Sequence, residues 1–355
     1  MAWNTDDFAG QSLEGLTRIR LNGKYGFIDK TGREVIPFKY AWVGGFIEGL
    51  APVKLNDKWG FIDVTGREIV PCKYDKVSDF KEGLAAVQLN GNWGYIDTTG
   101  REICSCKYYY ANKFHEGLAP VYLCGKWGFI DTTGREIVPC KYDLAWRCTE
   151  GFARVHRKGK WGYVDKTGRE VIPCIYDSAG IFSDGFAKVE LGNRQGFIDK
   201  TGKVVIPFKY AWTGDFKEGL APVQLNGKCG YIDKAGKEIC PFKYDYAREF
   251  YGGLGVVRIG DNIGIINCSG QEVIPLIFSD IYLVDSIIVV VADSQYGIIT
   301  SNREYILPCQ YDKIDINDDM IIARKSNTIY EYNQYGELVK IFCDSIFLVS
   351  IKNNF

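Results

Sequence analysis

Aspartate is the residue with chemical potential that recurs most regularly in this sequence, once in every 34 residues. The row comprises Asp29, Asp63, Asp97, Asp131, Asp165, Asp199 and Asp233. Carboxylates brought together in this way could act as acid–base pairs or bind Ca²⁺. Each aspartate, however, stands three residues before a glycine, as in Asp63-Val64-Thr65-Gly66, where a carboxylate can accept backbone N–H bonds. A turn of this kind supplies too few oxygen ligands for Ca²⁺. We therefore interpret the row as turn caps and predict no metal site.

Cysteine is the second candidate, with twelve residues in the chain. Four of them, Cys72, Cys106, Cys140 and Cys174, occupy one repeat position. The same position holds Phe38, Phe208, Phe242 and Leu276 elsewhere, which indicates an apolar packing site where the thiol acts as a small hydrophobe. A column of sulfurs that binds metal or forms disulfides is the alternative. It lacks Cys-x₂₋₄-Cys pairs, and Cys104-Ser105-Cys106 comes nearest.

The remaining candidates for catalysis are few. His115 and His156 are the only histidines, and both align with polar, exposed repeat positions that are not beside each other. A Ser–His or Cys–His pair is therefore not expected. The glycines recur with the repeat, and no phosphate-binding loop of the G-x-x-x-x-G-K-[ST] type is present. We predict that the protein is not an enzyme and carries no cofactor.

A Trp-Gly dipeptide marks the repeat that positions these residues. Its register runs through Tyr25-Gly26, Trp59-Gly60, Trp93-Gly94, Trp127-Gly128, Trp161-Gly162, Gln195-Gly196, Cys229-Gly230, Ile263-Gly264 and Tyr296-Gly297, with a last, eroded copy at Thr328-Ile329-Tyr330. A fixed period of this length indicates a repeat architecture of ten units. Because Gln, Cys and Ile replace the tryptophan, we interpret the Trp row as core and not as a ligand platform.

Within one unit the pattern predicts a β-meander. Leu50 to Leu55 alternates with a period of two, which is typical of a strand. Asn56-Asp57 forms a two-residue hairpin turn before a second strand from Trp59 to Asp63. After the Asp63 turn a third strand covers Arg67 to Val70, and Pro71 either ends it or places it at a sheet edge. A variable connection follows, with room for a short fourth strand.

The unit K-W-G-F/Y-I-D-x-T-G-R-E-I/V-I/V-P-x-K-Y-D resembles the WG (Trp-Gly) containing repeat family of bacterial proteins, strongly over residues 13–312 and weakly beyond. The resemblance implies a tandem β-repeat protein whose relatives mostly lack an assigned activity. It brings no catalytic residues to carry over. We divide the chain into a lead-in at 1–12, regular repeats at 13–262, and a degenerate portion with a cap at 263–355 that continues the array.

The expected fold class is all-β, with tandem 34-residue β-meander repeats that form an open β-solenoid or superhelix. Residues 344–351 resemble an eleventh first strand, which a closed ring would not require, and ten blades exceed the usual number in a propeller. The alternative is a closed or nearly closed β-propeller-like ring, because a short meander is also what a propeller blade contains.

Composition limits the partners. The net charge of −1 gives no argument for nucleic acid or an anionic membrane, and the longest apolar run, residues 287–292, is too short to span a bilayer. The first eight residues lack the basic and apolar regions of a signal peptide, and free thiols suit a reducing compartment, so we expect a cytoplasmic location.

The variable connection after each Lys-Tyr is the best candidate for a binding surface. Repeat scaffolds carry binding on such segments, and exposed Trp and Tyr are common interface anchors. The candidate residues for partner binding are Trp42, Tyr109, Tyr110, Trp146 and Trp212. The alternative is that these aromatics fill gaps between units. We predict a non-catalytic protein-interaction scaffold or accessory subunit, or alternatively a carbohydrate-binding module that stacks sugars on Trp42, Trp146 and Trp212.

Overall fold

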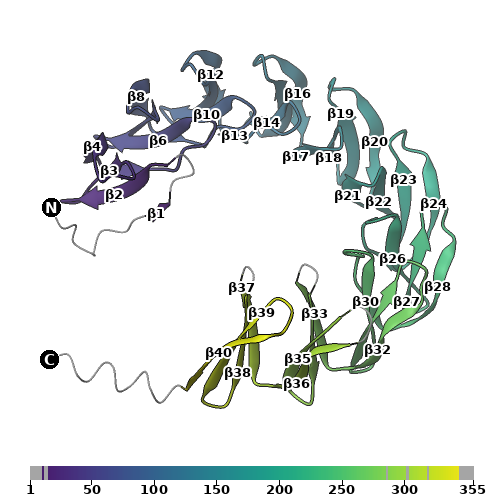
Figure 1. Ribbon diagram of the computed structural model, residues 1–355. Helices are drawn as coiled ribbons and strands as arrows, with labels where there is room; N and C mark the ends of the chain where they lie inside the picture. The colour runs from purple at the N-terminus through teal and green to yellow at the C-terminus, as the bar shows by residue number, and fades with distance from the viewer. Residues whose placement is uncertain (1–9, 12–14, 285–286, 301–303, 318–319, 344–355) are drawn as a thin grey trace. The chain divides into compact units, whose positions relative to one another are not determined.

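The computed structural model describes residues 10–11, 15–284, 287–300, 304–317 and 320–343. Every regular element in these ranges is a β-strand, and the strands form ten antiparallel sheets of four strands each (Figure 1). Sequence neighbours are also hydrogen-bonded neighbours, so each sheet is a meander. The predicted all-β class and the tandem meander repeat are confirmed. Among the described residues, none forms a helix with the length and apolarity that a bilayer crossing requires.

The strands fall into four positions within a sheet. The first strands are β1 (Gly10–Gln11), β5 (Trp42–Val43), β9 (Lys76–Val77), β13 (Tyr110–Ala111), β17 (Leu144–Thr149), β21 (Ser178–Ser183), β25 (Trp212–Thr213), β29 (Tyr246–Ala247), β33 (Asp280–Val284) and β37 (Lys313–Asn317). The second strands are β2 (Thr17–Leu21), β6 (Leu50–Leu55), β10 (Leu84–Leu89), β14 (Leu118–Leu123), β18 (Phe152–Arg157), β22 (Phe186–Leu191), β26 (Leu220–Leu225), β30 (Leu254–Ile259), β34 (Ile287–Ala292) and β38 (Met320–Lys325).

The third and fourth strands complete each meander. The third strands are β3 (Lys24–Ile28), β7 (Lys58–Asp63), β11 (Asn92–Asp97), β15 (Lys126–Asp131), β19 (Lys160–Asp165), β23 (Arg194–Asp199), β27 (Lys228–Asp233), β31 (Asn262–Asn267), β35 (Gln295–Ile299) and β39 (Thr328–Asn333). The fourth strands are β4 (Glu34–Tyr40), β8 (Glu68–Tyr74), β12 (Glu102–Tyr108), β16 (Glu136–Tyr142), β20 (Glu170–Tyr176), β24 (Val204–Tyr210), β28 (Glu238–Tyr244), β32 (Glu272–Phe278), β36 (Tyr305–Tyr311) and β40 (Leu338–Cys343).

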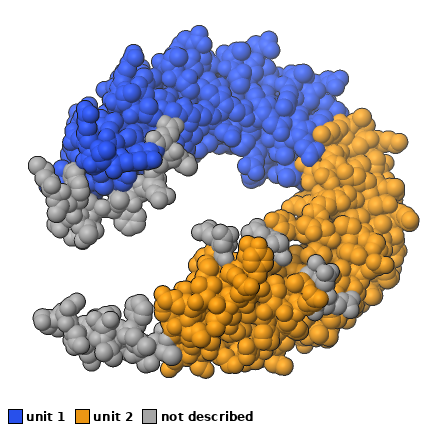
Figure 2. Space-filling view, in the orientation of Figure 1, with its two compact units in different colours: residues 1–181 blue, residues 182–355 orange. Residues whose placement is uncertain are grey.

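The chain forms two compact units, residues 1–181 and 182–355 (Figure 2). Within each unit the first and fourth strands are the two edges of every sheet. In the first unit β8, β12 and β16 lie along one side, and β13 and β17 lie along the other (Figure 1). The eleventh first strand predicted over 344–351 lies outside the described residues. The choice between an open array and a ring stays a prediction, as does the sequence boundary at 262/263.

The connection after Lys-Tyr belongs to the next sheet. In the second sheet β5 pairs with β6, which places Trp42 opposite Lys54. The short fourth strand that the sequence suggested at the end of a unit is therefore the first strand of the sheet that follows. The predicted hairpin between β6 and β7 is confirmed, because Asn56 and Asp57 both have the positive φ angles of a primed turn.

The glycine of the Trp-Gly pair lies under a bulge in the fourth strand. Trp59 is opposite Tyr74 and Phe61 is opposite Val70, so three residues of β8 face Gly60 alone. A Cβ atom at Gly60 would lie 2.3 Å from the carbonyl oxygen of Val70. No side chain fits there without a shift of the backbone. The strand continues through Pro71, which β8 accepts because it is an edge strand.

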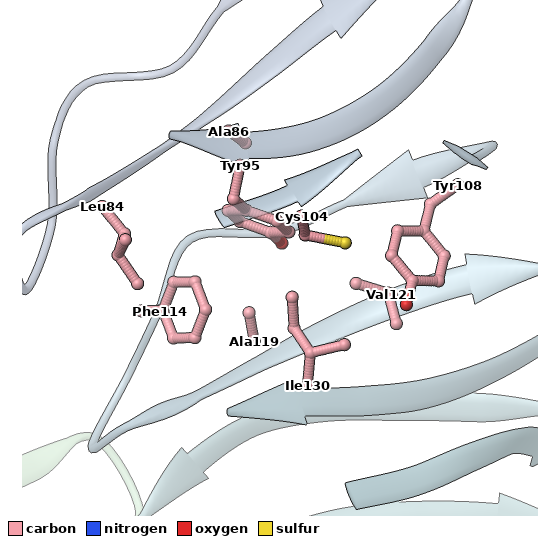
Figure 3. Packing of buried hydrophobic residues seen from close by; sticks show 9 residues of the cluster. All are labelled: Leu84, Ala86, Tyr95, Cys104, Tyr108, Phe114, Ala119, Val121 and Ile130. Atoms are coloured by element: carbon pink, nitrogen blue, oxygen red, sulfur yellow. The ribbon is translucent and has the colours of Figure 1, made fainter. Parts of the chain in front are cut away.

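The hydrophobic core lies between consecutive sheets and not within a sheet. In the second sheet, Val53 and Ile62 pack towards the preceding sheet, whereas Phe61 and Val70 pack towards the following one. Figure 3 shows the next interface, where Tyr95 and Tyr108 of one sheet meet residues of its neighbour. Both faces of an internal sheet are therefore buried, and a single unit has no complete core, as a repeat architecture requires.

A ladder of glutamates joins consecutive sheets at the turn before each second strand. Oε1 and Oε2 of Glu48 accept hydrogen bonds from the amides of Glu82 and Gly83, at 3.0 and 2.9 Å. Glu82 accepts in the same way from Glu116 and Gly117, at 2.7 and 2.8 Å. Glu116 and Glu218 repeat the arrangement, and Asp184 makes one such bond. Each carboxylate thus binds the turn one repeat further along the chain.

Replacing Gly60 with Ala is expected to lower the free energy of unfolding by about 1–3 kcal/mol, because the added methyl group forces the bulged strand away. Urea denaturation of the full chain measures the change. The matched control is Gly45→Ala, where a Cβ atom meets nothing within 4 Å. That variant should change stability by less than about 0.5 kcal/mol. Equal effects of the two substitutions would contradict the close-approach explanation.

Replacing Glu82 with Ala removes the acceptor for two amides of the next turn. We expect a loss of roughly 1 kcal/mol, because those amides can bind water instead. Hydrogen exchange of the Glu116 and Gly117 amides is the direct measurement, and both should exchange faster. Glu102→Ala, an exposed glutamate on β12, serves as the control. Unchanged protection at Glu116 and Gly117 would show that the ladder does not stabilise the turn.

Candidate interaction surface

The five predicted partner-binding residues are all exposed, from 37% for Trp212 to 62% for Tyr110. Trp42, Tyr110 and Trp212 each begin the first strand of a sheet, and Tyr109 directly precedes β13. Trp146 lies inside β17. All five therefore lie on first strands or directly before them, at one edge of their sheets.

In the second sheet a row of directly opposed residues crosses three strands and has a tryptophan at each end. Trp42 on β5 is opposite Lys54 on β6, which is opposite Trp59 on β7. The two indole rings are 5.0 Å apart in an edge-to-face arrangement. Trp59 is half-buried, as are Trp93, Trp127 and Trp161, and Trp93 and Trp127 pack against core clusters, so this row forms the margin of the core. These side chains share a face with the buried Phe61 position but lie near the hairpin end, where the core gives way to solvent.

The composition of this row differs from sheet to sheet. The corresponding opposed residues are Tyr110, Tyr122 and Trp127 in the fourth sheet, Leu144, His156 and Trp161 in the fifth, Trp212, Gln224 and Cys229 in the seventh, and Tyr246, Arg258 and Ile263 in the eighth. A constant backbone position thus carries variable chemistry, which is what a recognition surface on a repeat scaffold needs.

A groove of about 470 Å³ lies at this edge of the first unit. It is lined by Asn112, Lys113, His115, Pro120, Ala145, Trp146, Arg147, Arg154 and Ile181. Most of these residues come from the fourth and fifth sheets, at β17 and the segment after β13. The groove lies where consecutive sheets meet, beside the exposed aromatic positions.

A bulge in β17 explains why Trp146 and Arg147 both line the groove. The pairing of β17 with β18 shifts between Ala145 and Cys148, which gives β17 one extra residue. Consecutive strand residues normally point to opposite faces, and a bulge changes that direction. Two side chains of opposite character, an indole and a guanidinium, therefore contribute to the same surface.

Arg154 on β18 is held in place beneath Trp146. Its Nη1 donates a hydrogen bond to the carbonyl oxygen of Ala179, at 2.7 Å. Its guanidinium carbon lies 5.5 Å from the centre of the Trp146 ring and 5.7 Å from that of Trp161, both within the range of a cation–π interaction. At this position five other sheets have Pro52, Ala86, Pro120, Pro222 and Val256, whereas the first sheet has Arg18 and the sixth has Lys188. The first sheet shares this arrangement, because Nη1 of Arg18 donates to the carbonyl oxygen of Val43 at 3.2 Å.

A hollow of about 380 Å³ occupies the corresponding place in the second unit. Its lining includes Trp212, Lys217, Tyr246, Arg248, Glu249 and Tyr251. Lys217 is three repeats from His115, and Arg248 and Glu249 are three repeats from Trp146 and Arg147. Both units thus form a groove at the same repeat position, with different side chains.

The aspartate row caps turns, as the sequence predicts. Oδ1 of Asp63 accepts hydrogen bonds from the Thr65 hydroxyl at 2.7 Å and from the amides of Thr65 and Arg67 at 2.9 and 3.0 Å. The Thr65 hydroxyl has the largest effect and, with the amides, holds the pKa of Asp63 below its usual range although burial opposes it. Among the described residues no group of three or more His, Cys, Asp or Glu side chains is placed to hold a metal ion.

The cysteine column is half-buried, not fully buried. Cys72, Cys106, Cys140 and Cys174 each donate a weak hydrogen bond to a carbonyl oxygen, at 3.6 to 3.9 Å, and pack at the edge of a core cluster. Burial raises the pKa of these thiols, to about 11 for Cys140 and Cys174. The described cysteines are free thiols.

The histidines lie on different elements and are half-buried, so their expected exposure was wrong. His115 lines the groove just described. The ring of His156 packs on Trp161, with centres 4.9 Å apart, and its Nδ1 lies 4.0 Å from Oδ2 of Asp143. Arg154 was not among the residues predicted from sequence, although a cationic residue at a position that most repeats fill with proline, alanine or valine was a visible signal.

Fold and surface together define a tandem β-meander repeat protein with variable aromatic edges. The sequence profile of the WG containing repeat family matches residues 25–59, 59–93, 93–127, 127–161, 161–194, 196–229, 230–262 and 296–328. The chain belongs to this family. No curated protein sequence matches it.

Solved structures resemble the chain only distantly. Hsv2 from Kluyveromyces lactis is 11% identical over 64% of this chain and 96% of its own, with a TM-score of 0.34. A structure titled as a eukaryotic initiation factor is 12% identical over 94% of this chain and 97% of its own, with a TM-score of 0.36. PorZ, from the type-IX secretion system of Porphyromonas gingivalis, is 10% identical over 94% and 51%, with a TM-score of 0.27. Scores this low support no inference about function.

The capped turns predict an acid-dependent stability. A carboxyl group with a lowered folded pKa stabilises the fold above the pKa of the unfolded chain, about 4, and this contribution is lost as the pH falls through the folded pKa. The shifts at Asp29, Asp63, Asp97, Asp131, Asp165 and Asp199 have the same sign. We expect the urea midpoint to be flat near neutral pH and to fall below about pH 4.

Asparagine provides the control for this pH dependence. Asn267 caps its own turn with the same three hydrogen bonds, from Ser269 and Gln271, without a titrating group. Replacing the six aspartates with Asn should therefore keep the fold and flatten the decline in acid. An equally steep decline in that variant would show that other carboxyl groups control it.

Proposed function

We propose that the chain is a non-catalytic protein-interaction scaffold, or an accessory subunit of a larger assembly, in a bacterial cytoplasm. Its partner is another protein, held at the first-strand edge of the sheets. The observation that carries this proposal is the pair of grooves at one repeat position in both units, each beside exposed aromatic residues and arginine.

The residue types at this edge favour a protein partner. Trp, Tyr and Arg are enriched among residues whose truncation costs most in protein interfaces. Exposed tryptophans on first strands include Trp42, Trp146 and Trp212, and Arg147 and Arg248 line the two grooves. The net charge of −1 gives no support for nucleic acid or an anionic membrane as the partner.

A non-catalytic role agrees with the chemistry of the side chains. Burial raises the pKa of the cysteine column, which keeps those thiols protonated and poorly nucleophilic. The aspartates of the repeat are used in their own turns. The cationic and aromatic groups at the grooves are suited to binding, and no cofactor is needed for that role.

Carbohydrate binding is the alternative function, and exposed indole rings at Trp42, Trp146 and Trp212 favour it. The surroundings of two of these rings oppose it. Arg154 lies against the ring of Trp146, and Trp42 meets the edge of Trp59. Stacking on a sugar needs a free ring face, so we keep this function as the second candidate.

Affinity capture from the source cells tests the proposal. The full chain is immobilised in its wild-type form and as Trp42→Ala and Trp212→Ala variants. We expect a stoichiometric protein partner whose capture falls about tenfold or more in at least one Trp variant, as truncation of an interface anchor predicts. Quantitative mass spectrometry of the captured material gives the measurement.

The control variants are Ile175→Ala and Ile277→Ala, which remove exposed apolar side chains from fourth strands at the opposite edge. Capture should be unchanged in both. Loss of the partner with the Ile variants alone would place the interface elsewhere. Binding of a glycan array that depends on the same tryptophans, without a protein partner, would support the carbohydrate function instead.

A further inference from the structure

We propose that the groove at Trp146 in the first unit binds an acidic segment of a protein partner, one that carries apolar side chains beside its carboxylates. This inference rests on the proposed scaffold function and specifies the chemistry of one contact. The groove volume of about 470 Å³ lies within the range of roughly 300–1,000 Å³ found for ligand sites.

The charge of the groove is one-sided. Lys113, Arg147 and Arg154 line it, and its lining contains no carboxylate. This is unusual in a chain whose net charge is −1. Lys113 already pairs with Asp79, but Arg147 is exposed and forms no ion pair with any described residue. The groove therefore has positive charge that the described part of the chain does not neutralise.

One repeat position supplies three of the lining residues. Lys113, Arg147 and Ile181 are successive members of a column in which Gly45 and Asp79 precede them. The 2.6 Å ion pair from Lys113 Nζ to Asp79 Oδ2 shows that side chains in this column can reach the next repeat. Arg147 is followed by Ile181 and so has no acidic neighbour in the column. A carboxylate from a partner would take the place that Asp79 occupies for Lys113.

The remaining lining is apolar and partly fixed. Pro120, Trp146 and Ile181 provide the apolar surface. Arg154 is already oriented by its bond to Ala179 and by the indole above it. A fixed guanidinium loses little freedom on binding and can donate a charge-assisted hydrogen bond to a carboxylate. Apolar side chains flanking that carboxylate would contact Trp146 and Ile181.

The donor-rich lining argues against a neutral sugar. Hydroxyl groups of a sugar both donate and accept hydrogen bonds, whereas Lys and Arg side chains only donate. Carboxylates of a protein segment accept from such donors without needing a return bond. The groove in the second unit provides an internal comparison, because Glu249 stands there at the position of Arg147. The second unit therefore lacks the one-sided charge.

Selection from a random peptide library displayed on phage, with the full chain as bait, tests the proposal. Recovered peptides are synthesised with a fluorescent label and titrated by fluorescence anisotropy. We expect enrichment of Asp and Glu next to aromatic or branched apolar residues. Changing those acids to Asn and Gln should weaken binding about tenfold or more, and added salt should weaken it further.

Arg147→Glu is the decisive variant, because the scaffold already carries glutamate at this position in Glu249. It should weaken the selected peptides about tenfold or more while the urea midpoint stays unchanged. Trp146→Ala should weaken them as well. Arg248→Glu, in the groove of the second unit, is the matched control and should leave their affinity unchanged.

Three results would overturn the proposal. They are recovery of no peptide or only of neutral or basic peptides, equal affinity for wild type and Arg147→Glu, and binding of phosphorylated or sulfated probes in preference to carboxylates. The scaffold function is tested separately by the tryptophan variants. If capture still depends on Trp42 or Trp212 while acidic peptides fail, the groove assignment is wrong and the scaffold stands. If capture fails as well, both are wrong.

Discussion

The close approach between the glycine of each Trp-Gly pair and the bulged fourth strand is the constraint on which the first nine repeats depend. A carbonyl oxygen lies where a side chain would begin at Gly60, Gly94 and Gly128. Because of the bulge, residues of the fourth strand contribute to the core interfaces with both the preceding and the following sheet. The glycine is present in the first nine copies and is replaced by Tyr330 in the tenth, whereas the residue before it changes from Trp to Tyr, Gln, Cys or Ile. In the dipeptide that marks the repeat, packing therefore constrains the glycine position, whereas the preceding position accepts different side chains.

This division separates the framework from the surface. The framework consists of the glycine, the capped turn after the third strand, and apolar residues that alternate across two buried faces. The surface consists of the cross-strand row and the segment after each first strand. In the cross-strand row, Trp42, Tyr110 and Tyr246 occupy the same place. Because the framework residues do not include the exposed positions of the first strands, the side chains at those positions can differ from one sheet to the next.

Much of the local structure could be predicted from sequence because it depends on contacts within one unit. The hairpin at Asn56-Asp57 and the Asp63 turn involve residues a few positions apart, and the strands follow a period of two. The half-burial of Trp59 could not be predicted, since it depends on where the core between sheets ends. The groove at Trp146 was also missed as a cavity. It requires the bulge in β17 and the contact of Arg154 with a strand 25 residues further on.

The glutamate ladder gives the array a direction and an end. Each carboxylate accepts hydrogen bonds from the turn amides of the following repeat. A whole unit inserted into the array would therefore donate to the carboxylate of the preceding repeat and accept from the amides of the following one. Residues 27–58 and 197–228, five periods apart and nearly alike in sequence, fit such a history of exchange in whole units. At the eighth sheet Glu218 still binds two amides, but the first belongs to Gly252, which has no carboxylate to pass on. Within the residues that the structure describes, the ladder ends at Gly252, so exchange of whole units that preserves the ladder is confined to the repeats before it.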